Sequence, residues 1–315
     1  MRSRALGIVL GYAADRVLGD PQRGHPVAGF GRLSQVVERR LYADTRARGV
    51  VHAVVLIAAP VGLGIVAERT RYRPLLHGLA TAAATWVVLG GRTLEREALA
   101  VGAFLEVEDL PGARVQVQRL VGRDTDDLDA SEIARAVIES VAENSSDAVV
   151  APLVWGALAG IPGLLGYRAV NTLDAMVGHH NARYENYGWA SARIDDLANL
   201  PGSRLTGALV LGAAPGRARR AMAAWRRDAA AHPSPNAGVV EATFAGALGI
   251  RLGGTNRYYG QRIEHRAVMG DGRAPQAVDI ARATTLARRV GWGAAIVSGL
   301  VALRGQRGVR TQSPQ

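Results

Sequence analysis

The stretch GVVHAVVLIAAPVGLGIVA, residues 49–67, decides the fold that the sequence predicts. It carries no formally charged residue and, at a rise of about 1.5 Å per residue, it is about as long as a bilayer is thick. A second uncharged run, residues 74–91, follows after the arginine-rich link ERTRYR. Two such runs joined by a short charged loop predict a helical hairpin that crosses a membrane.

Further apolar segments extend this pattern along the chain. The run AVVAPLVWGALAGIPGLLGY, residues 148–167, is also uncharged, and we expect Pro152 and Pro162 to kink it. The N-terminal segment begins like a signal peptide, but Asp15 and Arg16 follow without a small-residue cleavage site, so a retained helix is predicted. The predicted spans are 3–18, 49–67, 74–91, 148–167, 290–303 and, although it is short for a span, 205–216.

The sequence therefore predicts an all-α, multi-pass integral membrane protein. Residues 1–304 are expected to form a single membrane domain with polar helical loops, followed by a disordered tail at residues 305–315. No strand-period alternation is long enough to predict a sheet, and we find no internal repeat. The alternative interpretation is a large soluble α-protein in which the apolar helices are buried.

The composition excludes several kinds of chemistry. The chain of 315 residues has no cysteine, which rules out disulfides, thiolate metal sites and cysteine nucleophiles. All 38 basic residues are arginine, which argues against a P-loop and against a pyridoxal Schiff base, because both need a lysine. The formal charge of +11 comes without a basic-aromatic recognition module, so no nucleic-acid partner is expected. Arginines beside apolar runs instead predict contact with anionic headgroups and anionic substrates.

Acidic side chains precede the uncharged run that starts at residue 148. Asp129 and Glu132 have the form of a capping box at a helix start. Glu139, Glu143 and Asp147 then recur at i, i+4 and i+8, so an α-helix places them on one face. Like charges at this spacing repel, and a structure that keeps them usually neutralises them with a cation or with arginines. Carboxylates at a membrane boundary are commonly functional, and a solvated acidic face is the alternative.

Three other polar segments are richer in functional side chains than mere connections require. Asp15 and Asp20 surround the end of the first predicted helix, which the Asp-Pro step terminates; they are expected to contact metal or substrate, or else only to form a turn. Asn171 and Asp174 share one helix face in the second segment. In the third, the sequence HPSPNAG, residues 232–238, predicts a rigid turn whose amides face an anion, and LGGTNRYYG after it is expected to be a loop.

Six stretches together give the chain a close resemblance to the cobinamide-phosphate synthase family, the CobD/CbiB membrane proteins of cobalamin biosynthesis. They occur in the order expected of the family and extend over most of the chain. They are GDP…GHPV (19–27), VGRDT (121–125), ESVAENSSDAVVAPL (139–153), YRAVNTLDAMVGH (167–179), GWASARIDDLANLP (188–201) and HPSPNAG…EATFAGALGIRLGG (232–254).

The resemblance implies an integral protein of the cell membrane that acts as an amide-forming ligase. It would join aminopropanol, or its phosphate, to a propionate of (adenosyl)cobyric acid and so make cobinamide or cobinamide phosphate. The implied partners are these two substrates and membrane lipids, and association with later enzymes of nucleotide-loop assembly is expected. The phosphate route is usually written with ATP, so ATP and Mg²⁺ are expected as well.

The chemistry of this reaction suggests roles for the polar residues. A carboxylate does not condense with an amine unaided, so its oxygen must become a leaving group, for which phosphorylation is the expected route. Phosphoryl transfer depends on positioning and on charge neutralisation by Mg²⁺ and arginines, whereas a carboxylate accepts the amine proton. The expected catalytic residues are Glu139, Glu143, Asp147 and Asp174, which would also bind Mg²⁺, and Asp195 or Asp196 as the proton acceptor. The expected substrate-binding residues are Asp15, Asp20, His25, Asn144, Arg168, Asn171, His179, Asn181, Arg193, His232, Ser234, Asn236 and Asn256.

Two other classes of protein fit parts of the same pattern. A membrane prenyltransferase-like enzyme would use Asn171, Asp174 and the acidic stripe to bind Mg-diphosphate, although it needs two separate Asp-rich motifs. A multi-pass transporter would use the intramembrane carboxylates to relay ions, and inverted repeats would favour it.

Overall fold

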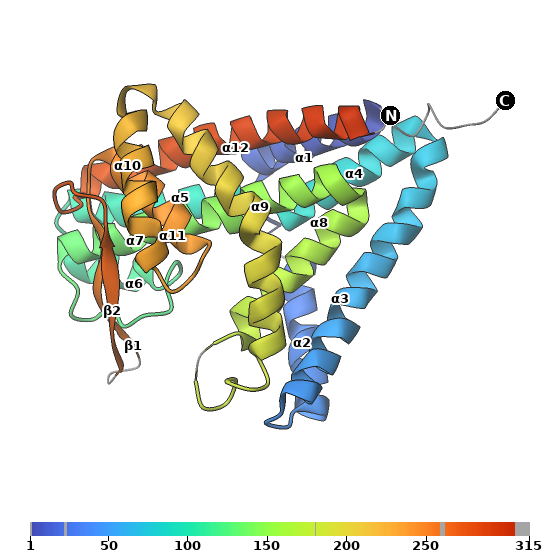
Figure 1. Cartoon of the computed structure of the whole chain (residues 1–315), viewed down its shortest axis with the longest axis horizontal. Helices are drawn as coiled ribbons and strands as arrows, with labels where there is room; N and C mark the ends of the chain where they lie inside the picture. The colour runs from blue at the N-terminus through green and yellow to red at the C-terminus, as the bar shows by residue number, and fades with distance from the viewer. Residues whose placement is uncertain (1, 22–23, 180, 259–261, 306–315) are drawn as a thin grey trace. The chain divides into compact units, whose positions relative to one another are not determined.

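The computed structural model describes residues 2–21, 24–179, 181–258 and 262–305 (Figure 1). Its contacts divide the chain into two units, and each unit is assembled from separate stretches of sequence. Unit 1 comprises residues 1–90, 147–202 and 294–315, and unit 2 comprises residues 91–146 and 203–293. We describe each unit by itself, and the expectation of a single membrane domain stays a prediction.

The regular secondary structure of unit 1 is helical in the part of the chain that the structure describes. Two long helices contribute to both units, because the boundaries fall inside α9 (Trp189–Ala213) and α12 (Ala277–Gly305). The elements that belong to unit 1 are α1 (Arg2–Leu18), α2 (Pro26–Leu41), α3 (Arg46–Glu68), η1 (Arg69–Tyr72), α4 (Pro74–Val88) and α8 (Ala151–Val177). The π-helical turn η2 (Ser146–Val150) joins α8 to the helix before it.

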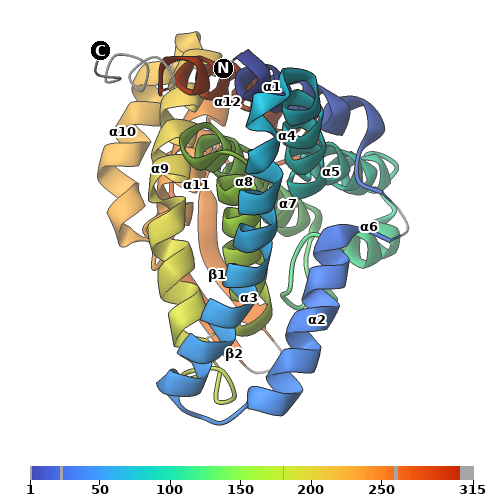
Figure 2. The same cartoon turned by 90° about the vertical axis from the view of Figure 1, so that its right-hand side faces the viewer.

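Close helix packing in unit 1 depends on small residues. Helix α1 packs on α4 through Gly7 and Gly11, where an added Cβ would lie only 2.6 Å from the Cβ of Thr81 and 2.4 Å from that of Thr85. Helix α3 packs along α8 (Figure 2), with Gly64 against the backbone of Pro162. Small residues that let helix backbones approach closely are typical of membrane helices.

Helix α8 is kinked next to Pro162, as predicted, whereas Pro152 lies in the first turn of the helix and not at a kink. Gly160 has φ +70° and ψ −148°, just before Pro162. The break frees the amide of Ile161, which donates a 3.0 Å hydrogen bond to the carboxylate of Glu68. Glu68 also lies 3.2 Å from the ring Nε2 of His77. A buried polar group must find a partner, so this carboxylate stabilises the kink.

Four helical segments are long and apolar enough to cross a membrane: Arg46–Tyr72, Pro74–Glu106, Ala130–Val177 and Ala277–Arg304. They contain the predicted runs 49–67, 74–91, 148–167 and 290–303, except that Leu89 and Gly90 interrupt the helix between α4 and α5. Helix α3 leaves large apolar side chains exposed, which is unfavourable in water. These are Val50, Val51, Val54, Val55, Leu63, Ile65 and Val66.

The other two predicted spans have a different outcome. The retained N-terminal helix is present as α1, but it is not among the four long apolar helices. Residues 205–213 are the end of α9 and not a separate helix, because α9 begins much earlier, at Trp189. The predicted tail falls almost wholly on residues 306–315, which lie outside the described residues.

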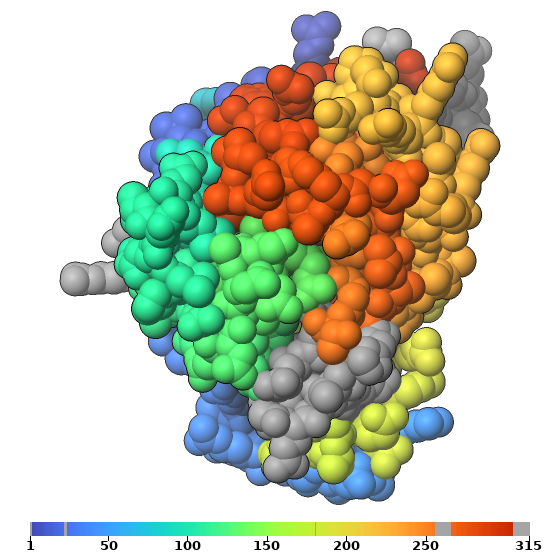
Figure 3. All heavy atoms as spheres, turned by 90° about the vertical axis from the view of Figure 1, so that its left-hand side faces the viewer, coloured from blue at the N-terminus to red at the C-terminus, as the bar shows by residue number. Residues whose placement is uncertain are grey.

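Unit 2 combines helices with one β-hairpin. Its helices are α5 (Gly91–Glu106), α6 (Leu110–Val117), α7 (Ala130–Ser145), α10 (Ala218–Asp228) and α11 (Ala237–Leu248), with short turns η3 (Pro215–Arg217) and η4 (Ala229–Ala231). The capping box of Asp129 and Glu132 at the start of α7 is present as predicted. Helix α11 is buried along its whole length and packs against α10 and α7. Figure 3 shows one side of this unit, with α7 in green against the orange segments that follow residue 250.

The hairpin corrects the expectation that no sheet forms and that LGGTNRYYG is only a loop. Strand β1 (Leu252–Tyr258) pairs antiparallel with β2 (Arg262–Met269). Its sequence is polar and glycine-rich, so it lacks the alternation that predicts a strand. Leu252 and Met269, which pair at its base, are buried, and α7 holds the backbone of β1 by hydrogen bonds. Tertiary contacts therefore form a strand that local sequence does not indicate.

Candidate functional site

All four predicted catalytic aspartates lie in unit 1, on three elements, together with several of the predicted substrate-binding residues. Asp20 follows the end of α1, and His25 is the N-cap of α2. Asp147 lies in the π-helical turn η2. Helix α8 carries Arg168, Asn171 and Asp174, and α9 carries Asp195, Asp196 and Asn199. A π-helical turn changes the spacing of an α-helix, so the i, i+4, i+8 argument does not extend to Asp147.

A hydrogen-bond chain links these helices inside unit 1. The hydroxyl of Tyr167 donates to the side-chain oxygen of Asn199 and lies 3.1 Å from the backbone carbonyl of Asp147. The Asn199 amide in turn donates a 2.8 Å hydrogen bond to Oδ2 of Asp195. Asn171 approaches Oδ1 of the same carboxylate at 3.4 Å. The carboxylate of Asp195 thus contacts two side-chain amides, that of Asn199 on the same helix, α9, and that of Asn171 on α8.

Burial changes the acidity of Asp195. Its side chain is 8% exposed, and desolvation, followed by the nearby charge of Asp174, raises its pKa to about 7. The hydrogen bonds from Asn199 and Asn171 oppose this rise. A carboxyl group with a pKa near 7 exchanges a proton readily at neutral pH. Tyr167 and Asn199 were not among the predicted site residues, although both lie within the stretches that carry the family resemblance.

The second feature of unit 1 is a mixed-charge group around Arg168. Its guanidinium lies near the carboxylates of Asp20 and Asp147, and its buried Nε–H has no hydrogen-bond acceptor among the described residues. His25 lies near Asp20 and Arg168, and burial, its largest influence, lowers its pKa. Nδ1 of His25 accepts a 3.1 Å hydrogen bond from the amide of Val27, so that nitrogen carries no proton. The arrangement suits an anionic ligand beside Arg168.

Unit 2 contains an open pocket of about 150 Å³ beside α7. Four of its lining side chains are charged, with two glutamates from α7 and arginines from two other segments. They are Arg123, Glu139, Glu143 and Arg266. This volume is below that of a typical drug-sized ligand site, so the pocket admits a small group or one side chain of a larger substrate.

The two glutamates of this pocket differ sharply in their contacts. Glu139 is 5% exposed, and its Oε2 accepts a 2.7 Å hydrogen bond from Arg123. Its Oε1 accepts a 2.8 Å hydrogen bond from the amide of Gly253. Glu143, one turn later, is exposed to the pocket, and no hydrogen bond or ion pair joins its carboxylate to another described residue. Only Glu143 therefore offers an open carboxylate.

Sequence reasoning missed a third glutamate near this pair. Glu241, on α11, is 1% exposed, and neither carboxylate oxygen has a hydrogen-bond partner among the described residues. Burial, followed by the charges of Glu139 and Glu143, raises its pKa. Nε2 of His232 lies 3.7 Å from its Oε1. A glutamate in an otherwise apolar helix, nine residues after His232, was the available sequence signal.

The expected magnesium ligands fall into both units. Glu139 and Glu143 lie in unit 2, and Asp147 and Asp174 lie in unit 1. Among the described residues, no three His, Asp or Glu side chains are grouped so that they could hold a metal ion. Both oxygens of Glu139 already accept hydrogen bonds from other groups, which makes it a less suitable ligand. The described side chains thus do not form a ready site for Mg²⁺, and the assignment of that ion stays a prediction.

The remaining expected substrate-binding residues are spread over both units. Asp15 is buried within α1, and Asn144 donates to the carbonyl of Ser140. Asn181 accepts hydrogen bonds from the amides of the loop after α8, in which His179 also lies. Arg193 pairs with Asp196 at 3.7 Å on α9. Asn256 lies in β1, and its side chain is outside the described part of the structure.

The rigid turn HPSPNAG is present between η4 and α11, but its amides point inward. The amide of Ser234 donates to Nδ1 of His232, and Oγ of Ser234 lies within hydrogen-bond distance of the amides of Asn236 and Ala237. The Asn236 side chain accepts from Ser203 and Arg204. The turn therefore caps α11, and these amides do not form the anion site that the sequence suggested.

These features define a mainly helical protein with four helices of membrane-spanning length and with buried carboxylates and arginines as its polar centres. Residues 8–287 match the family model described as CobD/CbiB protein, and the chain belongs to this family. The "Cobalamin biosynthesis protein CobD" of Mycobacterium tuberculosis H37Rv is 48% identical over 306 residues, which cover 96% of this chain and 97% of that protein. The protein of the same name from Rhodobacter capsulatus is 43% identical, covering 94% and 96%. No solved structure matches the chain.

Proposed function

We propose that this protein forms the amide bond between a propionate of cobyric acid and aminopropanol, or its phosphate, in cobalamin biosynthesis. Family membership over nearly the whole chain and the names of relatives that are 43–48% identical support the pathway. The buried polar centres support an enzyme. No specific observation favours the transporter or the prenyltransferase-like alternative.

Asp195 is the observation that carries the proposed chemistry. An amine is protonated in neutral water and becomes a nucleophile only when it loses that proton, so the reaction needs a base that titrates near neutrality. Asp195 has a pKa of about 7 and is held by two side-chain amides. Asp196, the other aspartate considered for this role, is more exposed and pairs with Arg193. We therefore assign proton acceptance to Asp195.

The reaction balances when ATP supplies the activation. A carboxylate oxygen of cobyric acid attacks the γ-phosphorus, ADP leaves, and an acyl phosphate forms. Asp195 accepts a proton from the ammonium group of the amine substrate, and the freed amine nitrogen then attacks the acyl carbon. The C–O bond to phosphate breaks, and the nitrogen gives its second proton to the departing phosphate. Arg168 is the proposed contact for an anionic oxygen of the activated group, because its guanidinium lies in the same unit, with a buried N–H that lacks an acceptor.

We also propose that the protein resides in the cell membrane with several spans. The support is the four helices of sufficient length and the exposed apolar side chains of α3. A membrane location brings the protein close to enzymes that act on the same corrinoid, so association with later enzymes of nucleotide-loop assembly belongs to the proposal.

The proposal is tested by the pH dependence of the purified protein in detergent. With cobyric acid, aminopropanol phosphate, ATP and Mg²⁺, product formation by the wild type should rise through pH 7 as Asp195 loses its proton. Asp195→Asn should lower kcat by about two to four orders of magnitude, the usual contribution of a general base. Asp196→Asn, the matched control one residue away, should keep the wild-type profile. An active Asp195→Asn variant with an unchanged profile would refute the assignment.

A further inference from the structure

Both oxygens of the Glu139 carboxylate accept hydrogen bonds inside unit 2. Oε2 accepts from Nη2 of Arg123 at 2.7 Å, and Oε1 accepts from the amide of Gly253 at 2.8 Å. Nε of Arg135, one turn earlier on α7, lies 3.9 Å from Oε1. A buried carboxylate with such partners is a structural centre, because breaking one contact leaves a buried charge without compensation.

A β-bulge explains why the backbone of Gly253 is available to α7. Strand pairing passes from Leu252 with Met269 to Gly254 with Arg266, so two residues of β2, Ala267 and Val268, stand opposite Gly253 and the extra residue lies on β2. The φ of Gly253 is +79°, and an added Cβ would collide with the carbonyl oxygen of Ala267. A bulge disrupts the ladder locally and bends the strand. The N–H and C=O of Gly253, opposite the bulge, bond outside the hairpin instead.

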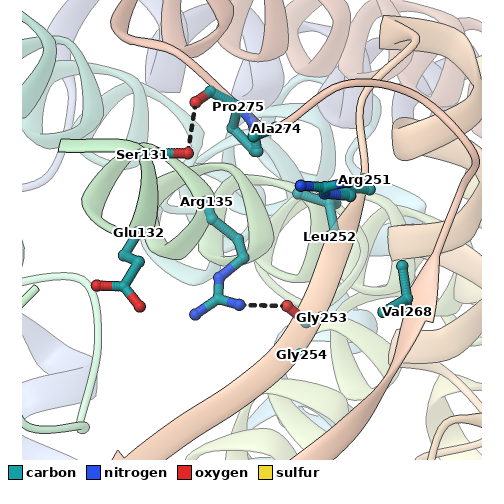
Figure 4. Close-up of a pocket in the computed structure, with 10 residues that line it drawn as sticks. All are labelled: Ser131, Glu132, Arg135, Arg251, Leu252, Gly253, Gly254, Val268, Ala274 and Pro275. Atoms are coloured by element: carbon teal, nitrogen blue, oxygen red, sulfur yellow. Dashed lines mark hydrogen bonds between the residues drawn. The ribbon is translucent and has the colours of Figure 1, made fainter. Parts of the chain in front are cut away.

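Two side chains of α7 bind the backbone N–H and C=O of Gly253. Glu139 accepts the N–H of Gly253. Arg135 donates to the carbonyl oxygen of the same residue (Figure 4). Arg135 also donates a 3.1 Å hydrogen bond to the carbonyl of Thr255. Because Glu139 and Arg135 are four residues apart, they project from the same face of α7. We call these contacts the bulge clamp.

The bulge clamp lies next to the charged pocket. Gly254, the residue after the bulge, pairs with Arg266 on β2, and Arg266 lines the pocket together with Arg123 and Glu143. Glu139 thus holds Arg123 by a direct hydrogen bond. It also holds the backbone of β1, with which Arg266 of β2 is paired. Both arginines line the same pocket as Glu143, the glutamate with the open carboxylate.

We propose that Glu139 is a positioning residue, which holds Arg123 and the β1–β2 hairpin in place and so sets the charges around Glu143, where substrate binds. The assignment replaces the magnesium role that the spacing of the acidic residues suggests. The clamp itself follows from the contacts in unit 2, whereas its effect on substrate rests on the proposed function.

Hydrogen exchange tests the clamp without any need for activity. In detergent-solubilised protein, Glu139→Gln should speed amide exchange in the segment 252–255 about tenfold or more, because it weakens a hydrogen bond to a charged acceptor. Arg135→Gln, which removes the hydrogen bond to the carbonyl oxygen of Gly253, should speed exchange in the same segment. Glu143→Gln and the exposed control Glu106→Gln should exchange like the wild type. Unchanged exchange in both clamp variants would overturn the proposal.

Kinetics separate positioning from direct chemistry. Glu139→Gln should raise the KM for cobyric acid or for aminopropanol phosphate about tenfold or more, leave kcat within a few-fold, and leave the Mg²⁺ concentration for half-maximal rate unchanged. The positioning role would be overturned if Glu139→Gln changed the Mg²⁺ concentration needed for half-maximal rate. It would also be overturned if this variant lost kcat while amide exchange at 252–255 stayed as in the wild type. If the wild type makes no amide product, the proposed function fails by itself, and the exchange experiment still decides whether the clamp exists.

Discussion

Replacing Asp195 by Asn should make the protein more stable at neutral and alkaline pH while it destroys activity. Burial and the charge of Asp174 raise the pKa of Asp195 from 3.8 to about 7. At about 1.4 kcal/mol per pKa unit, this rise corresponds to a cost of about 4 kcal/mol for holding the ionised form in the folded protein. Asn carries no charge and avoids that cost.

The hydrogen bonds around residue 195 reduce the gain. Asn171 and Asn199 each direct an N–H toward one oxygen of the carboxylate. An Asn side chain offers one carbonyl oxygen, so one of these amides then faces an NH₂ group, at a cost of about 1–2 kcal/mol. The net expectation above pH 7 is a variant that is about 2–3 kcal/mol more stable than the wild type. In a protein of this size, each kcal/mol of added stability raises the melting temperature by about 2 °C. The melting temperature of Asp195→Asn should therefore lie about 5 °C above that of the wild type.

The pH dependence has a definite sign. Between the unfolded pKa of 3.8 and the folded pKa of about 7, the folded wild type binds more protons at this site than the unfolded chain does. Its stability therefore falls as the pH rises through this window and levels off above it. The Asn variant lacks this slope, so it should be the less stable protein near pH 4 and the more stable one near pH 8.

Thermal unfolding of the two proteins in the same detergent, followed by tryptophan fluorescence from pH 4 to pH 9, measures this difference. The contribution of other groups cancels when the wild-type melting temperature is subtracted from that of Asp195→Asn at each pH. A difference that stays constant across pH 4–8, or that has the opposite slope, would show that Asp195 is not a buried carboxyl with a raised pKa.

Three further changes test other parts of the structure. Glu143→Gln should reduce product formation at least tenfold and leave the melting temperature unchanged, because it removes an open carboxylate without removing a hydrogen bond inside the protein. Equal activities of Glu143→Gln and Glu106→Gln in a product assay would contradict this expectation. Gly253→Ala should lower the free energy of unfolding by at least about 2 kcal/mol. A Cβ costs about 1–2 kcal/mol at positive φ, and here it would also collide with the carbonyl oxygen of Ala267. A melting temperature equal to that of the wild type would refute the bulge geometry. Glu68→Ala should destabilise the protein by about 2–3 kcal/mol by leaving the amide of Ile161 without its acceptor; chemical denaturation that shows no loss would mean that the kink in α8 needs no such partner.

The helices could be predicted because their signal is local. The run at residues 49–67 is uncharged and of bilayer length, and it lies in α3. The kink in α8 was also predictable, because proline has no amide hydrogen and disturbs the preceding turn. Its stabilisation by Glu68, far away in sequence, was not, since hydropathy says nothing about which distant carboxylate reaches a freed amide.

The candidate sites were predictable only as sets of residues. The spacing of Glu139 and Glu143 places both on one face of α7, but it cannot show that Arg123 and Gly253 occupy the first and leave the second open. Strand β1 was missed because its polar, glycine-rich sequence lacks alternation, whereas its pairing with β2 and its hydrogen bonds to α7 are contacts between segments distant in sequence. Glu241 was missed because its sequence signal, a single glutamate in an apolar helix, does not show that Glu139 and Glu143 lie near it in the fold.

Mass spectrometry of the corrinoid product shows whether this protein forms the proposed amide bond. Purified protein in detergent is incubated with cobyric acid, ATP, Mg²⁺ and ¹⁵N-labelled aminopropanol phosphate, and Asp195→Asn serves as the inactive control. We expect a corrinoid whose mass increases by that of the amine substrate less one water, with the label retained in an amide and one ATP cleaved per product. A wild-type protein that shows a melting transition, and is therefore folded, but leaves cobyric acid unchanged would refute the proposed function.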